Sequence, residues 1–524
     1  MRNYRILVSL LLTSLTIRLF YYFSSEIVMG NDAIANVNLA RHLASGDWRL
    51  GLDPYWSPLL PILTAIVSVF SDSLVLPIST ISIFAGSLVV VVTYYLVKQS
   101  YGEREAIIAA VIATFYPSLL NSTFEFGTEN VYLLLINFAL ITSWKGLVEN
   151  SRRNFLVTGL LLGLAYLTRP EAFGYLIFFV PLAFSKAFMG QKAFSRNHTK
   201  IFLAILLGFF LLAMPYILYL RSEIGYWTIS TKFQQHVIGG NFGELLFEKP
   251  DISKSKIPLI KSIITNLYSF NKSFYYLFPQ FLLIPLAIGL FRKSWTIDNY
   301  KREIFLLVFC VLTVLCYVIN VVEVRYFYVL LPILIGWLAR GIVEMEDWLL
   351  KTFQNLSINE PLTSKLPIYS ILFIALTFIY TFPLNKYSPL NERIWLNIPY
   401  EHKYAGVWLK ESAKSAPNIM SFESQPAFYA RGKHVPLPFY ARGKPIPLPS
   451  KDVNDVMKEA VSKHVDFLVI DERNLKDTPL NSLLTEPRNY PELELVYQNT
   501  EQKGYKIVIY KVKKEEIPLL AEPK

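Results

Sequence analysis

The chain has 524 residues, of which 53% are hydrophobic and 17% are charged, and its mean hydropathy is +0.36. Soluble domains usually contain about 25% charged residues, so this composition excludes an ordinary soluble protein and is typical of a membrane protein. The net charge of +11 does not indicate nucleic acid binding. No Arg- and Lys-rich stripe with interleaved aromatic residues is present, and many basic residues lie in short loops between apolar segments.

Apolar segments of a length that suits transmembrane helices follow one another through the first 384 residues. We predict about eleven spans, at residues 6–23, 74–97, 105–120, 127–147, 154–168, 172–188, 201–220, 273–291, 303–322, 326–343 and 367–384. The first resembles a signal peptide, but no cleavage site of small residues follows it. We interpret it as an uncleaved anchor in which Arg18 reaches toward the far membrane interface.

The loop charges predict the orientation of these spans. With the N-terminus in the cytoplasm, the inner loops hold eighteen Lys and Arg residues, whereas the short outer loops hold four. This bias follows the positive-inside rule. The one basic outer loop, 221–272, is long and therefore weighs less. An odd number of spans then predicts an extracytoplasmic C-terminus, in a multi-pass protein of the plasma or inner membrane.

The apolar segments stop near residue 384, which predicts a transmembrane domain at 1–384, with its first outer loop at 24–73, and a soluble domain at 385–524. Periodicity predicts that this second domain is α/β. Its expected elements are a helix at Tyr400–Lys414, strands at Ile419–Phe422 and Phe467–Ile470, and a hairpin of Leu493–Gln498 and Tyr505–Val512 around Lys503-Gly504.

A tandem repeat interrupts the soluble domain. Phe428–Pro438 reads FYARGKHVPLP and Phe439–Pro449 reads FYARGKPIPLP, so nine of eleven positions are identical. We interpret the repeat as a duplication that extends a proline-rich surface loop. The alternative is a basic loop that contacts an anionic acceptor or a lipid headgroup.

The first outer loop contains a short predicted helix that begins near Gly30 and stops at Gly46. Asp32 and Asn36 are four residues apart and therefore share one face of it. A carboxylate there could take a proton from an attacking hydroxyl, as a general base does. The alternative is that Asn31 or Asp32 only caps the helix.

Three further stretches place charged residues at predicted outer ends of spans. Glu129 borders an apolar run, where an ionisable side chain is costly and suggests function, although Thr128 or Glu129 could simply begin the helix. Arg169, followed by Pro170 and Glu171, and Arg325, two residues after Glu323, each follow an apolar segment. The arginines could bind phosphate bidentately, or each could form a local Arg–Glu pair that holds a turn.

The order of these stretches resembles that in the GT-C-fold membrane glycosyltransferases, in the branch of the dolichyl-phosphate-mannose protein mannosyltransferases and the lipid A aminoarabinose transferase. The resemblance covers residues 5–345 and continues more loosely beyond them. Its motifs are an early Asp in the first outer loop, the ARHLASGDW helix end at 40–48, YWSPLLP at 55–61, YGEREA at 101–106, TEN at 128–130, GLLLGL at 159–164 and TRPE at 168–171.

The resemblance implies transfer of a sugar, with inversion, from a polyprenyl-phosphate carrier to a protein, lipid or envelope-glycan acceptor on the extracytoplasmic side. It implies that Asp32 is the catalytic base and that Glu129 is a second catalytic carboxylate, near the acceptor or the base. It suggests Arg169, Glu171, Arg325, Asn36 and Tyr55 as substrate-binding residues. Many relatives have consecutive acids in the first loop, whereas this chain has Asn31-Asp32. Some GT-C enzymes use a divalent metal, but with so few clustered carboxylates we do not expect a tightly bound ion or another cofactor.

Two other classes of protein compete with this interpretation. A transporter or flippase of lipid-linked or envelope components usually has ionisable residues near the membrane midplane and internal repeats, whereas the charges singled out here lie at predicted outer span ends. A non-catalytic scaffold built on the same fold is the second alternative, and the presence of Asp32 and Glu129 argues against it.

Overall fold

The structure is a computed structural model of the whole chain. The residues that it describes are 2–24, 26, 28–71, 73, 75–181, 196–231, 259–291, 300–319, 322–355, 399–413, 415–431, 433–436, 453–475, 478–485, 490–499 and 505–513. The chain divides into two compact units, which are described separately. The first comprises Met1–Glu26 and Asn36–Pro389, and the second comprises Ile27–Ala35 and Leu390–Lys524. The predicted domain boundary at 384 and the predicted span at 367–384 lie outside the described residues.

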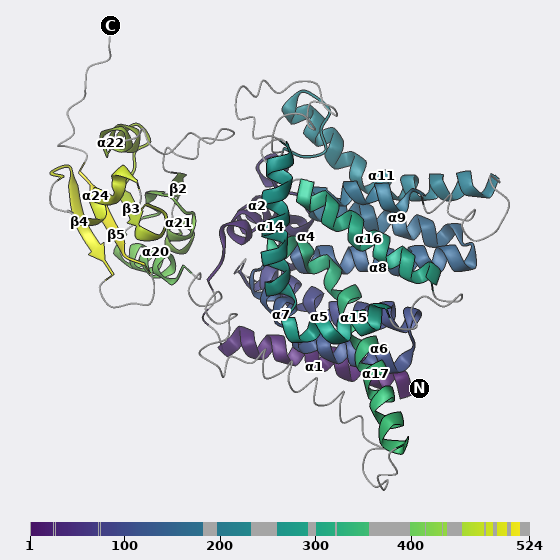
Figure 1. Ribbon diagram of the computed structural model, residues 1–524. Helices are drawn as coiled ribbons and strands as arrows, with labels where there is room; N and C mark the ends of the chain where they lie inside the picture. Colours follow the sequence, from purple (N-terminus) through teal and green to yellow (C-terminus); the bar gives the residue numbers. More distant parts are fainter. Residues whose placement is uncertain are drawn as a thin grey trace. The chain divides into compact units, whose positions relative to one another are not determined.

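The first unit is helical (Figure 1). Six stretches among the described residues are long and apolar enough to cross a membrane, and they become seven if one bent pair of helices is counted as a single span. Five of the six are single helices, and the sixth combines α17 with the 3-10 helix η5 before it. These elements are α1 (Arg2–Ser24), α5 (Val75–Ser100), α8 (Glu129–Glu149), α11 (Arg196–Ile224), α16 (Tyr300–Ile319), η5 (Val324–Leu330) and α17 (Leu331–Asn355).

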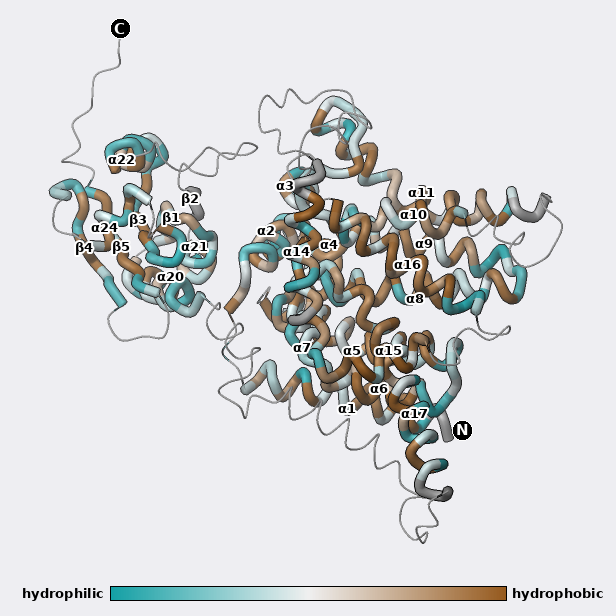
Figure 2. Tube along the Cα trace, viewed as in Figure 1, coloured by the Kyte–Doolittle hydropathy of each residue, from teal (hydrophilic) through white to brown (hydrophobic). Residues whose placement is uncertain are grey.

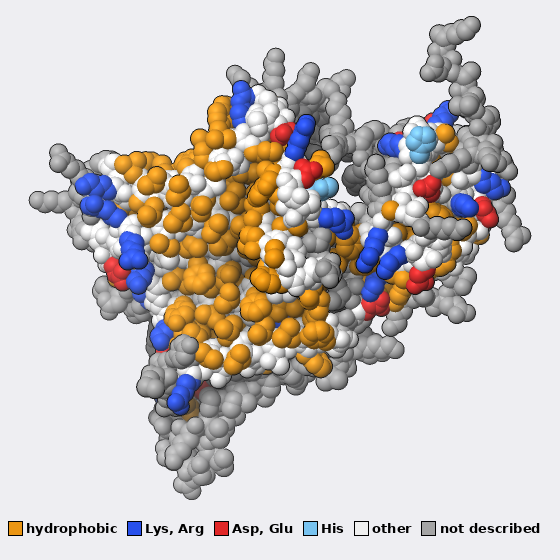
Figure 3. Space-filling view, turned by 180° about the vertical axis from the view of Figure 1, so that it is seen from behind, with side chains coloured by type: hydrophobic (Ala, Val, Ile, Leu, Met, Phe, Trp, Pro, Cys, Tyr) orange, Lys and Arg blue, Asp and Glu red, His pale blue; other side chains and the backbone are white. Residues whose placement is uncertain are grey.

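The apolar residues of this unit also cover its surface. Figure 2 shows predominantly hydrophobic helices, and Figure 3 shows a broad hydrophobic face with charged side chains near its margins. Leu207, Leu211 and Leu218 of α11 are among the exposed large apolar side chains. An apolar surface of this extent is characteristic of contact with lipid rather than water. The chain is therefore a multi-pass membrane protein.

Several predicted spans are shorter or more broken than expected. The bent pair is α6 (Glu103–Phe115) and α7 (Pro117–Phe124), which meet at 47°. Proline disfavours a helical conformation in the residue before it, and Tyr116 is accordingly extended. The predicted span 273–291 is likewise divided before Pro279. The remaining helical segments are α2 (Asn31–Ala44), α3 (Trp48–Gly51), α4 (Leu59–Ser68), α9 (Arg152–Thr168), η1 (Pro170–Tyr175), α10 (Leu176–Phe179), α14 (Leu259–Leu277), η4 (Gln280–Leu282) and α15 (Leu283–Phe291).

The count of about eleven spans is thus supported only as six or seven among the described residues. Helix α9 has only 17 residues and is therefore not among these six or seven spans. The predicted span 172–188 is described only as η1 and α10, because residues 182–195 lie outside the described part of the chain. Short helices of this kind do not display the long apolar run on which a sequence-based count depends.

Close helix packing explains the glycine motif at 159–164. A side chain at Gly159 of α9 would overlap the carbonyl oxygen of Ile205 in α11, and one at Gly208 would lie 2.5 Å from the carbonyl oxygen of Leu156. The backbones of α9 and α11 therefore approach each other more closely than larger residues would permit. Small residues at interfaces are a common way to pack helices in membranes.

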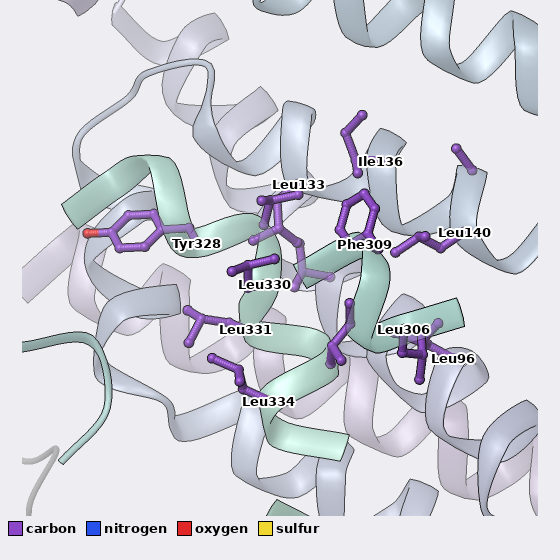
Figure 4. Close-up of a cluster of buried hydrophobic side chains, with 14 of the residues drawn as sticks. Leu96, Leu133, Ile136, Leu140, Leu306, Phe309, Tyr328, Leu330, Leu331 and Leu334 are labelled. Atoms are coloured by element: carbon purple, nitrogen blue, oxygen red, sulfur yellow. The ribbon is translucent and has the colours of Figure 1, made fainter. Parts of the chain in front are cut away.

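The segment that carries Arg325 is packed against α8. Figure 4 shows Leu133, Ile136 and Leu140 of α8 in one apolar cluster with Phe309 of α16 and with residues of η5 and α17. The side-chain amide of Asn137 in α8 also donates a hydrogen bond of 3.1 Å to the carbonyl oxygen of Val329 in η5. Glu129 and Arg325 therefore lie on elements that share one core.

The second unit contains a five-stranded sheet in the order β2-β1-β3-β5-β4. Strand β1 pairs in parallel with β2 and β3, whereas β5 is antiparallel to β3 and β4. The strands are β1 (Asn418–Ser421), β2 (Lys433–Pro436), β3 (Phe467–Asp471), β4 (Leu493–Gln498) and β5 (Ile507–Val512). The helical segments are α20 (Tyr400–Ser412), α21 (Gln425–Ala430), α22 (Val453–Ser462), α23 (Glu472–Leu475), η8 (Pro479–Asn481) and α24 (Ser482–Thr485).

Alternation along the strands produces two apolar layers, one on each face of the sheet. Ile419 and Ile507 belong to a cluster that includes residues of α20 and α21, whereas Met420 and Val508 belong to a cluster that includes residues of α22 and α24. Successive side chains of a strand point to opposite faces, which explains this division. The predicted helix, strands and hairpin pairing are all present in the described residues, although the Lys503-Gly504 turn lies outside them.

The first copy of the tandem repeat is not only a surface loop. It begins in the last turn of α21, passes through Arg431 with a φ of 54°, and continues as strand β2 beside β1. The interpretation as a proline-rich loop was therefore wrong for this copy, because backbone pairing with β1 depends on a partner distant in sequence. The second copy lies outside the described residues.

Part of the first outer loop belongs to the second unit. The Asn31 side chain donates to the Glu423 carboxylate and accepts hydrogen bonds from the backbone N–H and the hydroxyl of Ser424. The Tyr429 hydroxyl accepts a hydrogen bond of 2.8 Å from the backbone N–H of Met29. Asn31 is thus used in tertiary contacts, and α2 begins at Asn31 with Asp32 in its first turn.

Candidate functional site

Three of the predicted site residues, from positions far apart in the sequence, meet in the first unit. The carboxylate oxygen Oε1 of Glu129 lies 3.2 Å from Nη1 of Arg169 and 3.7 Å from Nη1 of Arg325. Glu129 is the first residue of α8, Arg169 directly follows α9, and Arg325 lies at the start of η5. Each residue stands at the end of a helical element, where a turn presents its side chain toward the other two.

Two further carboxylates complete this cluster. Glu171 Oε1 lies 3.4 Å from Arg169 Nη2, and Glu323 Oε2 lies 2.6 Å from Arg325 Nε. The local Arg–Glu pairs that the sequence suggested as an alternative are therefore both present. The same two arginines also reach Glu129, so local pairing does not exclude a shared site.

Aromatic rings surround the two guanidinium groups. The Tyr326 ring centre lies 4.8 Å from Cζ of Arg169 and 5.8 Å from Cζ of Arg325, and the Tyr132 ring centre lies 5.7 Å from Cζ of Arg169. A cation over an aromatic face is stabilised by the ring quadrupole, and more strongly where water is excluded. The rings therefore help to fix both arginines in their orientations.

Burial distinguishes the two arginines. The Arg169 side chain is 11% exposed and the Glu129 side chain 3%, whereas the Arg325 side chain is 33% exposed. Arg169 is enclosed by two carboxylates and two rings. Arg325 pairs with Glu323 and Glu129 through two different nitrogens, and about a third of its side chain is exposed.

The local backbone shows why the chain presents these side chains. Arg169 has an extended conformation because Pro170 disfavours a helical residue before it, and this ends α9. On the other side of the cluster, Phe126 has a φ of 50° in the turn before α8. Gly127 in this turn lies against the carboxylate of Glu129, and a Cβ there would overlap Oε2. A glycine at this position is thus a condition for the observed placement of Glu129.

The remaining predicted residues lie elsewhere. Asp32 is half-buried in the first turn of α2 and belongs to the second unit, whereas Asn36, one turn later, is buried and belongs to the first. Tyr55 lies in the turn between α3 and α4, where its backbone N–H donates to Oδ1 of Asp53 at 2.7 Å. Tyr216 of α11 holds this turn through a hydrogen bond of 3.0 Å from its hydroxyl to the carbonyl oxygen of Asp53.

Each carboxylate of this cluster is paired with an arginine of the chain itself through one of its oxygens. Among the described residues, no group of three or more His, Cys, Asp or Glu side chains is arranged to hold a metal ion. The carboxylates of Glu129, Glu171 and Glu323 each accept an ion pair from Arg169 or Arg325. The arrangement can therefore orient guanidinium groups toward an anion.

Some residues of the cluster were not among the sequence-based site candidates. Tyr132 is one helical turn after Glu129 in α8, and that spacing is the signal that could have identified it. Tyr326 directly follows Arg325, and that adjacency is the signal that could have identified it. Gly127 precedes Glu129 by two residues, but its role depends on the side-chain position of Glu129, which a single sequence does not reveal.

Comparisons with known proteins agree with this architecture. A family model described as dolichyl-phosphate-mannose-protein mannosyltransferase matches residues 57–219. No curated protein matches the chain. The structure is similar to the oligosaccharyltransferase of Archaeoglobus fulgidus in its apo form, with a TM-score of 0.61 and 15% identity over 99% of this chain and 75% of that one. It is also similar to ArnT from Cupriavidus metallidurans bound to undecaprenyl phosphate, with a TM-score of 0.60 and 13% identity over 99% and 98% of the two chains.

At such low identities the structural likenesses show the fold, and the family match adds a relationship in sequence over the part that contains Glu129 and Arg169. The resemblance inferred from the order of the sequence motifs is thereby confirmed. The chain therefore has the fold of the GT-C membrane glycosyltransferases, and its residues 57–219 match the dolichyl-phosphate-mannose-protein mannosyltransferase family.

Proposed function

We propose that this glycosyltransferase moves a sugar from a polyprenyl-phosphate carrier to an acceptor on the extracytoplasmic side, with inversion at the anomeric carbon. The observation that carries the proposal is the partly exposed Arg325 side chain, whose guanidinium group pairs with Glu323 and Glu129. ArnT was solved with undecaprenyl phosphate, and the archaeal oligosaccharyltransferase AglB was solved with dolichol-phosphate and an inhibitory peptide. A lipid phosphate is therefore the anion that we assign to Arg325.

The proposed reaction needs a base and a cation. An acceptor hydroxyl attacks the anomeric carbon and loses its proton to Asp32, while the bond to the phosphate oxygen breaks and its electron pair leaves with the polyprenyl phosphate. Asp32 is assigned as the base from its place in the first outer loop and from the family resemblance. Arg325 stabilises the negative charge that develops on the leaving phosphate, since a preorganised cation stabilises a charged transition state.

Burial supports different roles for Glu129 and Arg169 from those first predicted. Glu129 is enclosed and paired with two arginines, which favours a role in holding Arg325 over direct proton transfer. Arg169 is shielded in the same way and fixes Glu129. Glu171 in turn pairs with Arg169. Asn36 and Tyr55 remain candidates for binding the substrate.

The proposed membrane arrangement has about eleven spans, a cytoplasmic N-terminus and an extracytoplasmic C-terminal domain. The excess of Lys and Arg in the predicted inner loops supports this orientation. It assigns Asp32, Glu129, Arg169 and Arg325 to the extracytoplasmic side, where a lipid carrier would present its sugar. The acceptor class could be a protein, a lipid or an envelope glycan.

A transfer assay with purified protein tests this proposal. The donors are a panel of polyprenyl-phosphate-linked hexoses and pentoses, and the compared proteins are the wild type, Asp32→Asn and the control Asp47→Asn. Asp47 lies in the same outer loop, where its carboxylate accepts a hydrogen bond of 3.1 Å from the backbone N–H of Leu50. We expect Asp32→Asn to lose transfer and Asp47→Asn to retain it. Unchanged turnover in Asp32→Asn would remove Asp32 from the mechanism, and lipid movement without bond formation would favour a transporter.

A further inference from the structure

A buried arginine lies inside the first membrane span. Arg18 of α1 is fully buried, and its guanidinium group donates to the side chain and the carbonyl oxygen of Ser14, to Oγ1 of Thr123 at 3.2 Å and to the carbonyl oxygen of Leu119 at 3.4 Å. The expectation that Arg18 extends to the membrane interface was wrong. The hydroxyl and carbonyl oxygens of α1 and α7 hold it between the helices instead.

The partners of Arg18 make this position expensive. Among the described residues, every hydrogen-bond acceptor of its guanidinium group is a neutral oxygen, and no carboxylate forms an ion pair with it. A buried charge without an opposite charge is destabilising, and ionisable side chains within membrane spans usually have a functional role. Stabilisation of the fold alone is therefore a poor explanation for an arginine here.

The hydrogen bonds continue from Arg18 to the start of α8. Thr123 Oγ1 accepts from Arg18 and also from Nδ2 of Asn130, at 3.3 Å. The other side-chain atom of Asn130, Oδ1, accepts a hydrogen bond of 2.7 Å from Ser122. A Cβ at Gly86 of α5 would lie 2.6 Å from Thr123 Oγ1 and 2.9 Å from Arg18 Nε, so the absence of a side chain there leaves room for this network.

Asn130 directly follows Glu129, and both residues lie in the first turn of α8. A network that fixes the Asn130 side chain from α1 and α7 therefore also fixes the backbone from which the Glu129 side chain extends. Glu129 in turn lies within ion-pair distance of Arg325. Outer partners that orient a functional group often affect its activity strongly, as they do around metal ligands.

We propose that Arg18 is a positioning residue which, through Thr123 and Asn130, fixes Glu129 and hence the donor-phosphate arginine, Arg325. This inference rests on the proposed function. It assigns a role in donor binding to a residue of the first membrane span that does not contact the ion cluster in any described interaction. Thr123 is the junction of the network, because its hydroxyl group serves both Arg18 and Asn130.

The test removes this junction while preserving its shape. Thr123→Val replaces the hydroxyl with a methyl group, and Thr114→Val makes the same change at a buried threonine of the adjoining helix α6, whose hydroxyl donates to the carbonyl oxygen of Ala110 in its own helix. We expect Thr123→Val to lower kcat/KM for the polyprenyl-phosphate sugar about tenfold, whereas Thr114→Val leaves it unchanged. Thr123→Ser, which keeps the hydroxyl, should restore it. Thermal unfolding in detergent measures the stability of all three variants.

A double-mutant comparison separates positioning from a general loss of stability. In a Glu129→Gln background with measurable residual transfer, Thr123→Val should lower kcat/KM by less than about twofold, because its effect passes through Glu129. A full additional tenfold loss there, or equal losses in Thr123→Val and Thr114→Val, would overturn the inference and leave the proposed function intact. A wild type that transfers no sugar from any donor of the panel would overturn the proposed function and this inference with it.

Discussion

Replacing Gly127 with alanine should displace the Glu129 carboxylate without disrupting the fold. A Cβ at this position would overlap Oε2 of Glu129 and lie 3.1 Å from its Cδ, inside the 3.4 Å at which ordinary contact begins. Gly127 is not among the residues with positive φ, so alanine does not strain the backbone there. The flexible end of the Glu129 side chain must therefore yield, by about 1 Å or more given the usual separation of packed atoms.

A small displacement of the Glu129 carboxylate is enough to weaken its ion pairs. Glu129 Oε1 is 3.2 Å from Arg169 Nη1 and 3.7 Å from Arg325 Nη1, so a shift of about 1 Å takes it beyond hydrogen-bond distance of both. Because a misplacement of about 1 Å can lower turnover about 100-fold, we expect Gly127→Ala to reduce kcat/KM for the donor by about 10- to 100-fold. The melting temperature should change little, since alanine restricts the unfolded chain and only a side chain moves.

The assay measures sugar transfer and thermal unfolding on the same purified proteins. Gly174→Ala is the control, because Gly174 lies in η1 close in sequence to Glu171 and a Cβ there meets no atom within 4 Å. Transfer by Gly174→Ala should equal that of the wild type. Normal kinetics in Gly127→Ala would refute the reasoning, because the placement of Glu129 would then not matter to the reaction.

Three further predictions concern other contacts. Arg325→Gln should weaken donor binding about 10- to 100-fold, because it removes a charged hydrogen-bond donor. Arg325→Lys should weaken it less, because lysine keeps the charge and loses only the planar geometry. An unchanged donor KM and unchanged polyprenyl phosphate binding in Arg325→Gln would contradict the assignment. Asn31→Asp should lower the melting temperature, because it brings a second carboxylate against that of Glu423 and the two negative charges repel each other. Adding Glu423→Gln to Asn31→Asp should restore the melting temperature. A further decrease in the double variant would exclude charge repulsion as the cause. Burial alone would lower the pKa of His402, but the Asp471 carboxylate, 3.7 Å away, and neighbouring acids outweigh it and raise the pKa above its usual value. The resulting stabilisation is full below about pH 6.5 and is lost as the pH rises through the folded-state pKa of His402. Between about pH 6 and about pH 9, the melting temperature should therefore fall more in the wild type than in His402→Asn. Parallel curves of melting temperature against pH would show that this pair does not contribute to stability.

The sequence alone determined the features that depend on neighbouring residues. Apolar runs identified six or seven membrane spans among the described residues, and short apolar runs identified strands of the C-terminal domain, because both signals are local. The sequence also placed Arg169 at the end of an apolar segment, where α9 ends. The order of short motifs was sufficient for the family, and it selected Glu129, Arg169 and Arg325 as candidates without showing that they meet.

Only the tertiary structure decided how those candidates differ. Arg169 and Arg325 have similar local sequences, each with a nearby glutamate, yet one is enclosed and the other is partly open because different helices pack around them. The same is true of Arg18, which local sequence assigned to the membrane interface and which hydroxyl and carbonyl oxygens about a hundred residues away hold in the interior. Periodicity reports which face of a helix is apolar, but the partner of a charged side chain is set by contacts between segments distant in sequence. Those contacts turned a set of plausible residues into a site with distinct roles.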